Sequence, residues 1–185
     1  MSQQSLVMIG AIVSALLIAI IIFNTLIGRK NRVHQAFSTI DVMLKKRFDL
    51  IPNLLATAKK YMVHERELLD RLTALRAMAS SGGDLTDNQR LQTENQITQT
   101  LRSLFAVSEN YPSLRANENF LQLQGSLNEV EEQLSASRRA YNAAVTDFNN
   151  GVEMFPLNIA ARIMGYTTQL WLEIPDEERQ PVKVH

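Results

Sequence analysis

Residues 6–27 read LVMIGAIVSALLIAIIIFNTLI and include no charged side chain. A helix of this length rises roughly 33 Å at about 1.5 Å per residue, which matches a hydrocarbon core of about 30 Å. The stretch therefore predicts one transmembrane helix, preceded by a short tail at residues 1–5. A cleaved signal peptide would need a basic segment before a shorter apolar core, and a small-residue cleavage site after it. Ser2-Gln3-Gln4-Ser5 is not basic and no such site follows Ile27, so we expect an uncleaved anchor.

The charges that follow this stretch predict its orientation. The chain has no net charge, yet residues 29–60 hold eight Lys and Arg against two acidic residues, whereas residues 61–185 hold eleven against seventeen. Arg29, Lys30 and Arg32 form a membrane-proximal basic cluster, and such clusters stay on the cytoplasmic side. We expect a single-pass protein of the cytoplasmic (inner) membrane with its N-terminus outside and its C-terminal domain in the cytoplasm. The cluster also favours contact with anionic lipid, so the bilayer is the first expected partner.

The composition narrows the remaining classes of function. A balanced charge gives no support to nucleic-acid binding, which usually leaves a strong basic excess. The chain has no cysteine, which removes disulfides, thiol catalysis, thiolate metal sites and a lipoprotein anchor together.

The chain beyond residue 28 has the apolar spacing of amphipathic helices. A stripe with steps of three and four residues starts at Val33 and continues to Leu75, which predicts a first helix from about 31 to 79. Pro52 should kink or restart this helix, with Asp49 as the cap of the restarted part. A break is expected at 80–83, and Thr86-Asp87-Asn88-Gln89 fits a capping box that starts a second helix.

Two further helices complete the predicted fold. Tyr111-Pro112 should end the second helix, and a third should begin near 113–117, with an Asn cap, and stop at Gly151. Its heptad stripe consists of Phe120, Leu123, Leu127, Val130, Leu134, Ser137, Tyr141, Ala144 and Phe148. A short helix is expected at 156–165. The fold class is therefore all-α: one N-terminal transmembrane helix at 6–27, an antiparallel bundle of about three long helices plus the short one at 28–165, and a tail at 166–185 that lies on the surface or is mobile.

Unequal helix lengths predict self-association. The first helix is longer than the others, so the apolar stripe before Pro52 is expected to lack cover within the chain. We expect Phe37, Ile40, Leu44 and Phe48 to face neighbouring copies in a homo-oligomer.

Three segments resemble one protein family. They read IDVMLKKRFDLIPNLL at 40–55, ENYPSLRANENFLQLQGSLNEVEEQLSASRRAYNAAVTDFNN at 109–150, and FPLNIAA at 155–161. Together with the apolar stretch before them, they resemble the LemA family. The resemblance implies a bacterial long-helix bundle on a single membrane anchor, with no agreed activity, cofactor or catalytic residue. It also implies a link to membrane organisation, because one branch of the family takes part in building magnetosome membranes.

No catalytic, cofactor-binding or metal-binding residues are predicted. The histidines are His34, His64 and His185, and no Glu-x-x-His motif of a bundle metal centre exists. No phosphate-binding loop or Gly-x-Ser-x-Gly motif is present. Asp41, Asp49, Glu129, Glu131 and Glu132 would suit acid–base chemistry only in a pocket, and surface ion pairs such as Asp41 with Lys45 explain them more simply.

These observations favour a function that is not enzymatic. We expect a membrane-anchored helical scaffold that self-associates and organises or shapes the bacterial cytoplasmic membrane. The alternative is an adaptor or sensor subunit that recruits a protein partner, either a soluble protein or a membrane enzyme.

Overall fold

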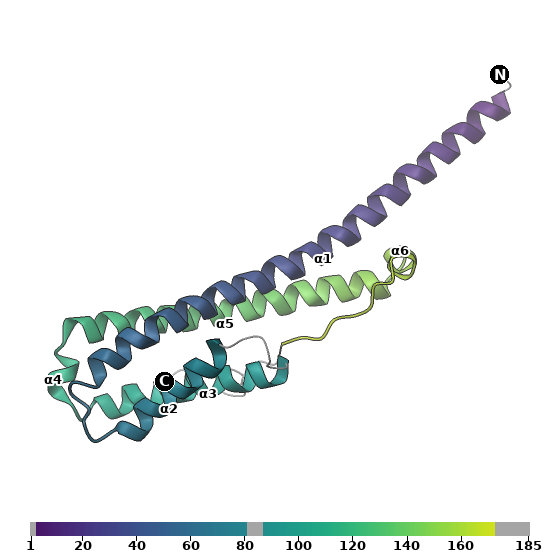
Figure 1. The fold of residues 1–185 in the computed structure, drawn as a ribbon. Coiled ribbons are helices and arrows are strands. Elements are labelled where there is room, and N and C mark those ends of the chain that lie inside the picture. Colours follow the sequence, from purple (N-terminus) through teal and green to yellow (C-terminus); the bar gives the residue numbers. More distant parts are fainter. Residues whose placement is uncertain (1–2, 81–86, 173–185) are drawn as a thin grey trace, which may run out of the picture. The chain divides into compact units, whose positions relative to one another are not determined.

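The computed structural model describes residues 3–80 and 87–172, and helix is the only regular secondary structure within them (Figure 1). The all-α prediction is confirmed. Thr86 of the predicted capping box and residues 173–185 of the predicted tail lie outside the described residues. The helices are α1 (Gln3–Ala58), α2 (Arg66–Ser80), α3 (Asp87–Ser108), α4 (Pro112–Arg115), α5 (Glu118–Glu153) and α6 (Leu157–Ile163).

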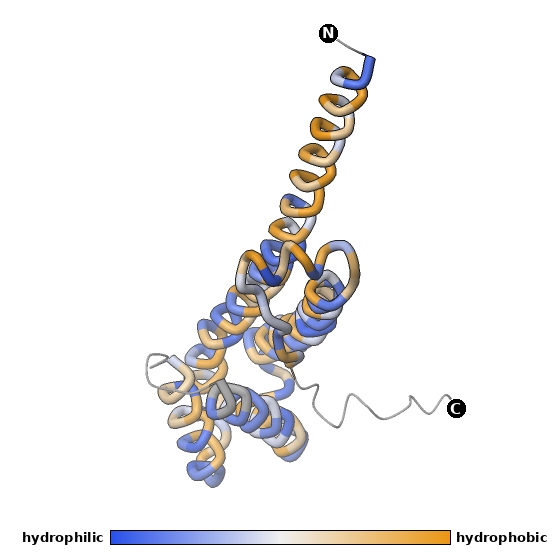
Figure 2. Tube along the Cα trace, turned by 90° about the vertical axis from the view of Figure 1, so that its right-hand side faces the viewer, coloured by the Kyte–Doolittle hydropathy of each residue, from blue (hydrophilic) through white to orange (hydrophobic). Residues whose placement is uncertain are grey.

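The first part of α1 is the apolar segment of the sequence. Figure 2 shows it as a hydrophobic helix that begins at the N-terminal end of the described chain. Its large side chains from Leu6 to Ile21 are exposed. Among the described helices, α1 alone is long and apolar enough to cross a membrane, which fits a single-pass anchor near the N-terminus.

The described residues divide into two compact units, and α1 and α5 contribute to both. Unit 1 consists of residues 3–40 and 136–172, and unit 2 consists of residues 41–80 and 87–135. Each unit has its own hydrophobic core.

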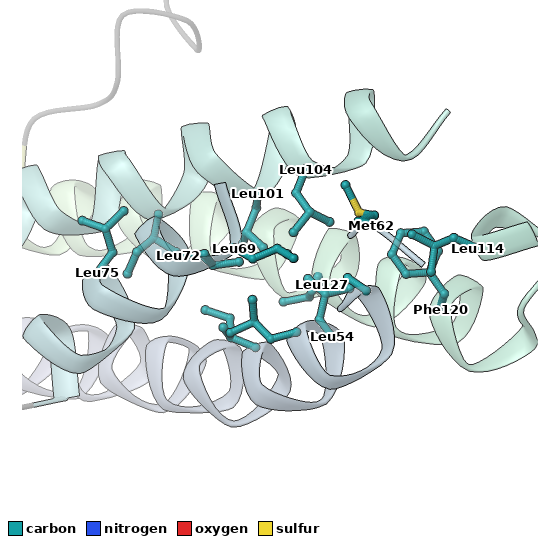
Figure 3. Packing of buried hydrophobic residues seen from close by; sticks show 14 residues of the cluster. Leu54, Met62, Leu69, Leu72, Leu75, Leu101, Leu104, Leu114, Phe120 and Leu127 are labelled. Carbon is teal, nitrogen blue, oxygen red and sulfur yellow. The ribbon is translucent and has the colours of Figure 1, made fainter. Parts of the chain in front are cut away.

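Unit 2 is a helical bundle with a leucine-rich core, shown in Figure 3. Phe120 and Leu127 of the predicted heptad stripe take part in it, and Val130 and Leu134 are also buried. The remaining helices contribute mostly leucines, which Figure 3 labels as Leu54, Leu69, Leu72, Leu75, Leu101, Leu104 and Leu114.

The first long helix ends earlier than predicted. It stops at Ala58, where the carbonyl oxygen accepts hydrogen bonds from the N–H groups of Tyr61 and Met62, and α2 starts at Arg66. Tyr61 and Glu65, within this turn, are bound by side chains that lie near the start of α4 and α5: Asn117 Nδ2 donates to Tyr61 Oη at 3.2 Å, and Tyr111 Oη donates to Glu65 Oε1 at 3.2 Å. The apolar stripe continues across the turn because Met62 and the leucines of α2 fill the same core.

The sequence predicted a kink or a restart at Pro52, and the restart is wrong, because α1 continues through this residue. Proline has no N–H, so the carbonyl of Phe48 loses its helical donor. Arg76 of α2 supplies a replacement: its Nε donates to the Phe48 carbonyl oxygen at 3.2 Å. A side chain from a neighbouring helix thus satisfies the group that Pro52 leaves unpaired.

We predict that Arg76→Met lowers the free energy of unfolding by about 1–3 kcal/mol, because it strands a partly buried carbonyl. In a Pro52→Ala background the N–H of residue 52 returns to Phe48, so the same substitution should cost clearly less. Denaturant titration of the four proteins of this cycle, followed by circular dichroism, measures the difference. Equal costs in both backgrounds would show that Arg76 does not compensate for Pro52.

The third predicted helix is divided near its start. Pro112 opens the short α4, and α5 begins at Glu118. Asn117 is the cap that the sequence predicted, since its Oδ1 accepts the N–H of Phe120 at 3.1 Å. The predicted stop at Gly151 is wrong, because α5 continues to Glu153.

Candidate functional site at the base of the apolar helix

In unit 1 the basic cluster that follows the apolar segment is bound to α5. Arg29 Nη1 donates to the carbonyl oxygen of Asp147 at 2.7 Å and lies 3.2 Å from its Oδ1. Arg32 Nη2 donates to Asp147 Oδ2 at 2.8 Å. Lys30 Nζ lies 4.4 Å from the ring centroid of Tyr166. The three predicted membrane-proximal residues thus lie together in one contact region of unit 1, where they meet Asp147 and Tyr166.

Gly151 explains how closely the two helices approach each other. A Cβ atom at this position would lie 3.2 Å from Leu26 Cδ1 and 3.3 Å from Arg29 Cδ. Gly151 is an interior residue of α5 whose missing side chain leaves room for Leu26 and Arg29 of α1. It does not end the helix as predicted. The contacts run antiparallel, because Asp147 meets Arg29 and Arg32, while Gly151 meets Leu26 and Arg29.

The end of the predicted membrane span is part of the core of unit 1. Leu26 is fully buried in a cluster with Val33 of α1, Val145 and Phe148 of α5, and Ala160 and Ala161 of α6. Ile22 and Phe23, which also lie within the predicted span, pack against the same cluster. The short helix α6 confirms the element predicted at 156–165, and Gly165 follows it with a φ of +67°, a conformation that favours glycine.

Two asparagines on α5 hold the segment that follows α6. Asn149 Nδ2 donates to the carbonyl oxygen of Gln169, and Asn149 Oδ1 accepts the N–H of the same residue, at 2.9 and 2.8 Å. Asn142 makes the same pair of bonds with Leu172, both at 2.9 Å. The first residues of the predicted tail are therefore fixed on the surface of α5. The seven-residue spacing of the asparagines was the available signal, but a solvated helix face gives the same pattern.

The proposed self-association stripe has more cover within the chain than expected. Ile40 and Leu44 are buried in a single copy, and Phe48 packs against the core of unit 2. Phe37 is partly exposed and its ring centroid lies 5.9 Å from that of Tyr141. The premise that this stripe lacks intrachain cover is wrong for Ile40, Leu44 and Phe48, so self-association through these residues remains a prediction without that support.

The polar groups of unit 2 serve as links between helices. Arg47, which is 3% exposed, lies with Nη1 3.1 Å from Glu131 Oε2, and its Nη2 donates to Thr98 Oγ1 at 2.8 Å. Glu131 therefore pairs across helices, where the sequence suggested a pair along one helix.

Partial burial and the hydrogen bond to the carboxylate of Glu65 raise the pKa of the Tyr111 hydroxyl. The hydroxyl therefore stays protonated and can donate this hydrogen bond.

The described residues offer little for catalysis. No group of three or more His, Asp or Glu side chains among them is placed to hold a metal ion. A hollow of about 270 Å³ lies near the end of α1, and it is lined by Lys59, Met62, Val63, Arg66, Leu69 and Asp70. This lining combines aliphatic and charged side chains without a histidine, serine or cysteine nucleophile.

Comparison with known proteins places the chain among related sequences. The model of the LemA family matches residues 36–185. Protein LemA of Metamycoplasma hominis is 27% identical, over 75% of this chain and 63% of its own length. Magnetosome proteins MamQ 1 and MamQ 2 of Paramagnetospirillum magneticum are each 24% identical, over 78% of this chain and 62% of their own lengths. The chain thus spans less than two thirds of each of these relatives. Because the family match includes most of the chain and its three characteristic segments, the chain belongs to the LemA family.

Proposed function

We propose that this protein is a non-enzymatic, membrane-anchored helical scaffold that self-associates and organises or shapes the cytoplasmic membrane of a bacterium. The observation that carries the proposal is the burial of Leu26, from the predicted span, in the core of unit 1.

The end of the anchor is part of the folded domain and does not only attach the domain to the membrane. A domain that only needs to stay near a membrane can hang on a flexible linker, which leaves its own core complete. Here the last turns of the span supply core residues, and Arg29 and Arg32 fix the next turn to Asp147. Unit 1 would therefore be held directly against the bilayer, as a protein that acts on membrane shape requires.

The relatives favour a role in membrane organisation. Two of them are magnetosome proteins by name, which agrees with the link to membrane organisation that the family resemblance implies. Confinement of anchored copies to one plane raises their effective concentration, which favours self-association through even a weak surface. We place the bundle in the cytoplasm, because Arg29, Lys30 and Arg32 directly follow the span.

One observation favours the alternative, an adaptor or sensor subunit that recruits another protein. The burial of Ile40 and Leu44 removes the stripe that was expected to need a second copy. A monomer could then present its exposed surface to a protein partner.

The full chain with Val42→Cys tests both parts of the proposal. Val42 is exposed and the chain has no other cysteine. We expect a membrane-impermeant thiol reagent to leave this residue unlabelled in intact cells and to label it after lysis. Light scattering of the protein extracted in mild detergent should give the mass of one homogeneous oligomer.

Labelling in intact cells would reverse the orientation. A monomer that co-purifies with another protein would replace the scaffold with the adaptor.

A further inference from the structure

The segment at residues 154–163 exposes an apolar surface beside the end of the predicted span. Phe155 is 79% exposed, Ile163 70% and Ile159 53%, and Met154 is exposed as well. Ile159 and Ile163 are four residues apart and lie on one face of α6. The opposite face carries Ala160 and Ala161, which are buried in the core of unit 1. A helix with two apolar faces needs cover on both, and the structure covers one.

The contacts between α1 and α5 give the height of this surface relative to the span. Going along α5, Asp147 meets Arg29 and Arg32, and Gly151 meets Leu26 and Arg29. Each turn of α5 therefore lies closer to the apolar segment of α1. The N–H of Met154 still bonds to the carbonyl oxygen of Asn150, so Met154 lies about one turn, or roughly 5 Å, beyond Gly151. Because Gly151 is level with Leu26, Met154 reaches the level of the last two turns of residues 6–27, which the span places in hydrocarbon. Phe155 follows it directly.

We propose that residues 154–163 form an interfacial element whose side chains Met154, Phe155, Ile159 and Ile163 insert into the membrane leaflet that surrounds the end of the span. The partner is the lipid of this leaflet, because lipid is the first apolar material present at that height. Arg162 is exposed on the same helix, and basic side chains at the headgroups strengthen this kind of binding. The proposal rests on the insertion of α1 into a membrane and does not depend on self-association.

The absence of cysteine makes the proposal accessible to single labels on the full chain. The variants Ile159→Cys and Ile163→Cys are each labelled with a small environment-sensitive fluorophore. The labelled protein is then reconstituted in vesicles of phosphatidylethanolamine and phosphatidylglycerol. Ile18→Cys in the span is the reference for lipid, and Val42→Cys, exposed in unit 2, is the reference for water. Quenchers on lipid acyl chains should reduce the fluorescence at 159 and 163 as they do at 18. Iodide, present on both sides of the membrane, should reduce it at 42 only.

Three results would overturn the proposal, and they differ from one another. Quenching of 159 and 163 by iodide, as at 42, would show that the surface faces water. Protection from both quenchers would show that protein covers it. Iodide quenching at 18 as well would refute the membrane anchor itself, and the proposed function with it.

Discussion

Replacing Leu44 with glutamate is expected to abolish the cooperative unfolding of the protein. Leu44 is 2% exposed on α1, so the new carboxylate would lie in an apolar interior without a partner. An unpaired buried charge of this kind costs more than about 5 kcal/mol, which is comparable to the total stability of a domain, about 5–15 kcal/mol. Thermal melts of the full chain in detergent, followed by circular dichroism, measure the loss.

The matched control is Val42→Glu, two residues away on the same helix. Val42 is 59% exposed, so its replacement should change the free energy of unfolding by no more than about 0.5 kcal/mol. One other outcome would support the predicted self-association surface after all. If Leu44→Glu left a folded protein and only broke an oligomer into monomers, this face of α1 would be an interface between copies.

The helices were predictable because burial on one side of a helix is encoded in the spacing of apolar residues. Phe120, Leu127, Val130 and Leu134 are buried as the heptad stripe indicated. The same signal does not show where the chain turns when both flanks fill one core. Met62 lies in the turn and is as buried as the leucines of α2, so the pattern continued past the true end of α1.

Polar contacts between helices were beyond the reach of the sequence. Asp147 binds Arg29 and Arg32 from more than a hundred residues away, and that pairing depends on the register of α1 against α5. The arginines themselves were identified, because their position after an apolar span carries meaning by itself. The restart at Pro52 was wrongly expected for the same reason: Arg76, which satisfies the carbonyl of Phe48, comes from another helix.

The burial of Ile40 and Leu44, in the predicted self-association stripe, was missed for a similar reason. Helix lengths suggested that the first helix would outrun its neighbours, since the predicted third helix was shorter. In the structure α1 ends at Ala58, and α5 is 36 residues long. Apolar periodicity shows that Ile40 and Leu44 need cover, and gives no sign of whether this chain or another copy supplies it.

The second large effect is expected at the ion pair of unit 2. Arg47 is almost completely buried, and the carboxylate of Glu131, which is 29% exposed, lies 3.1 Å from it. Glu131→Ala removes the counter-charge that Glu131 supplies to the guanidinium and keeps the hydrogen bond from Arg47 Nη2 to the hydroxyl of Thr98. Removing one partner of such a pair is expected to cost about 3–5 kcal/mol, measured by denaturant titration. The neighbouring exposed Glu132→Ala should cost no more than about 0.5 kcal/mol.

A double variant separates the strength of the pair from the cost of burying the arginine without the Glu131 carboxylate. Arg47→Met with Glu131→Leu replaces both charges with apolar side chains of similar length, and such exchanges are often neutral or stabilising. We therefore expect the double variant to recover most of the stability that Glu131→Ala loses. If Glu131→Ala costs as little as Glu132→Ala, the pair does not hold α1 to α5. If the double variant is as unstable as the single one, the shape of this site, and not its charge, determines how the two helices pack.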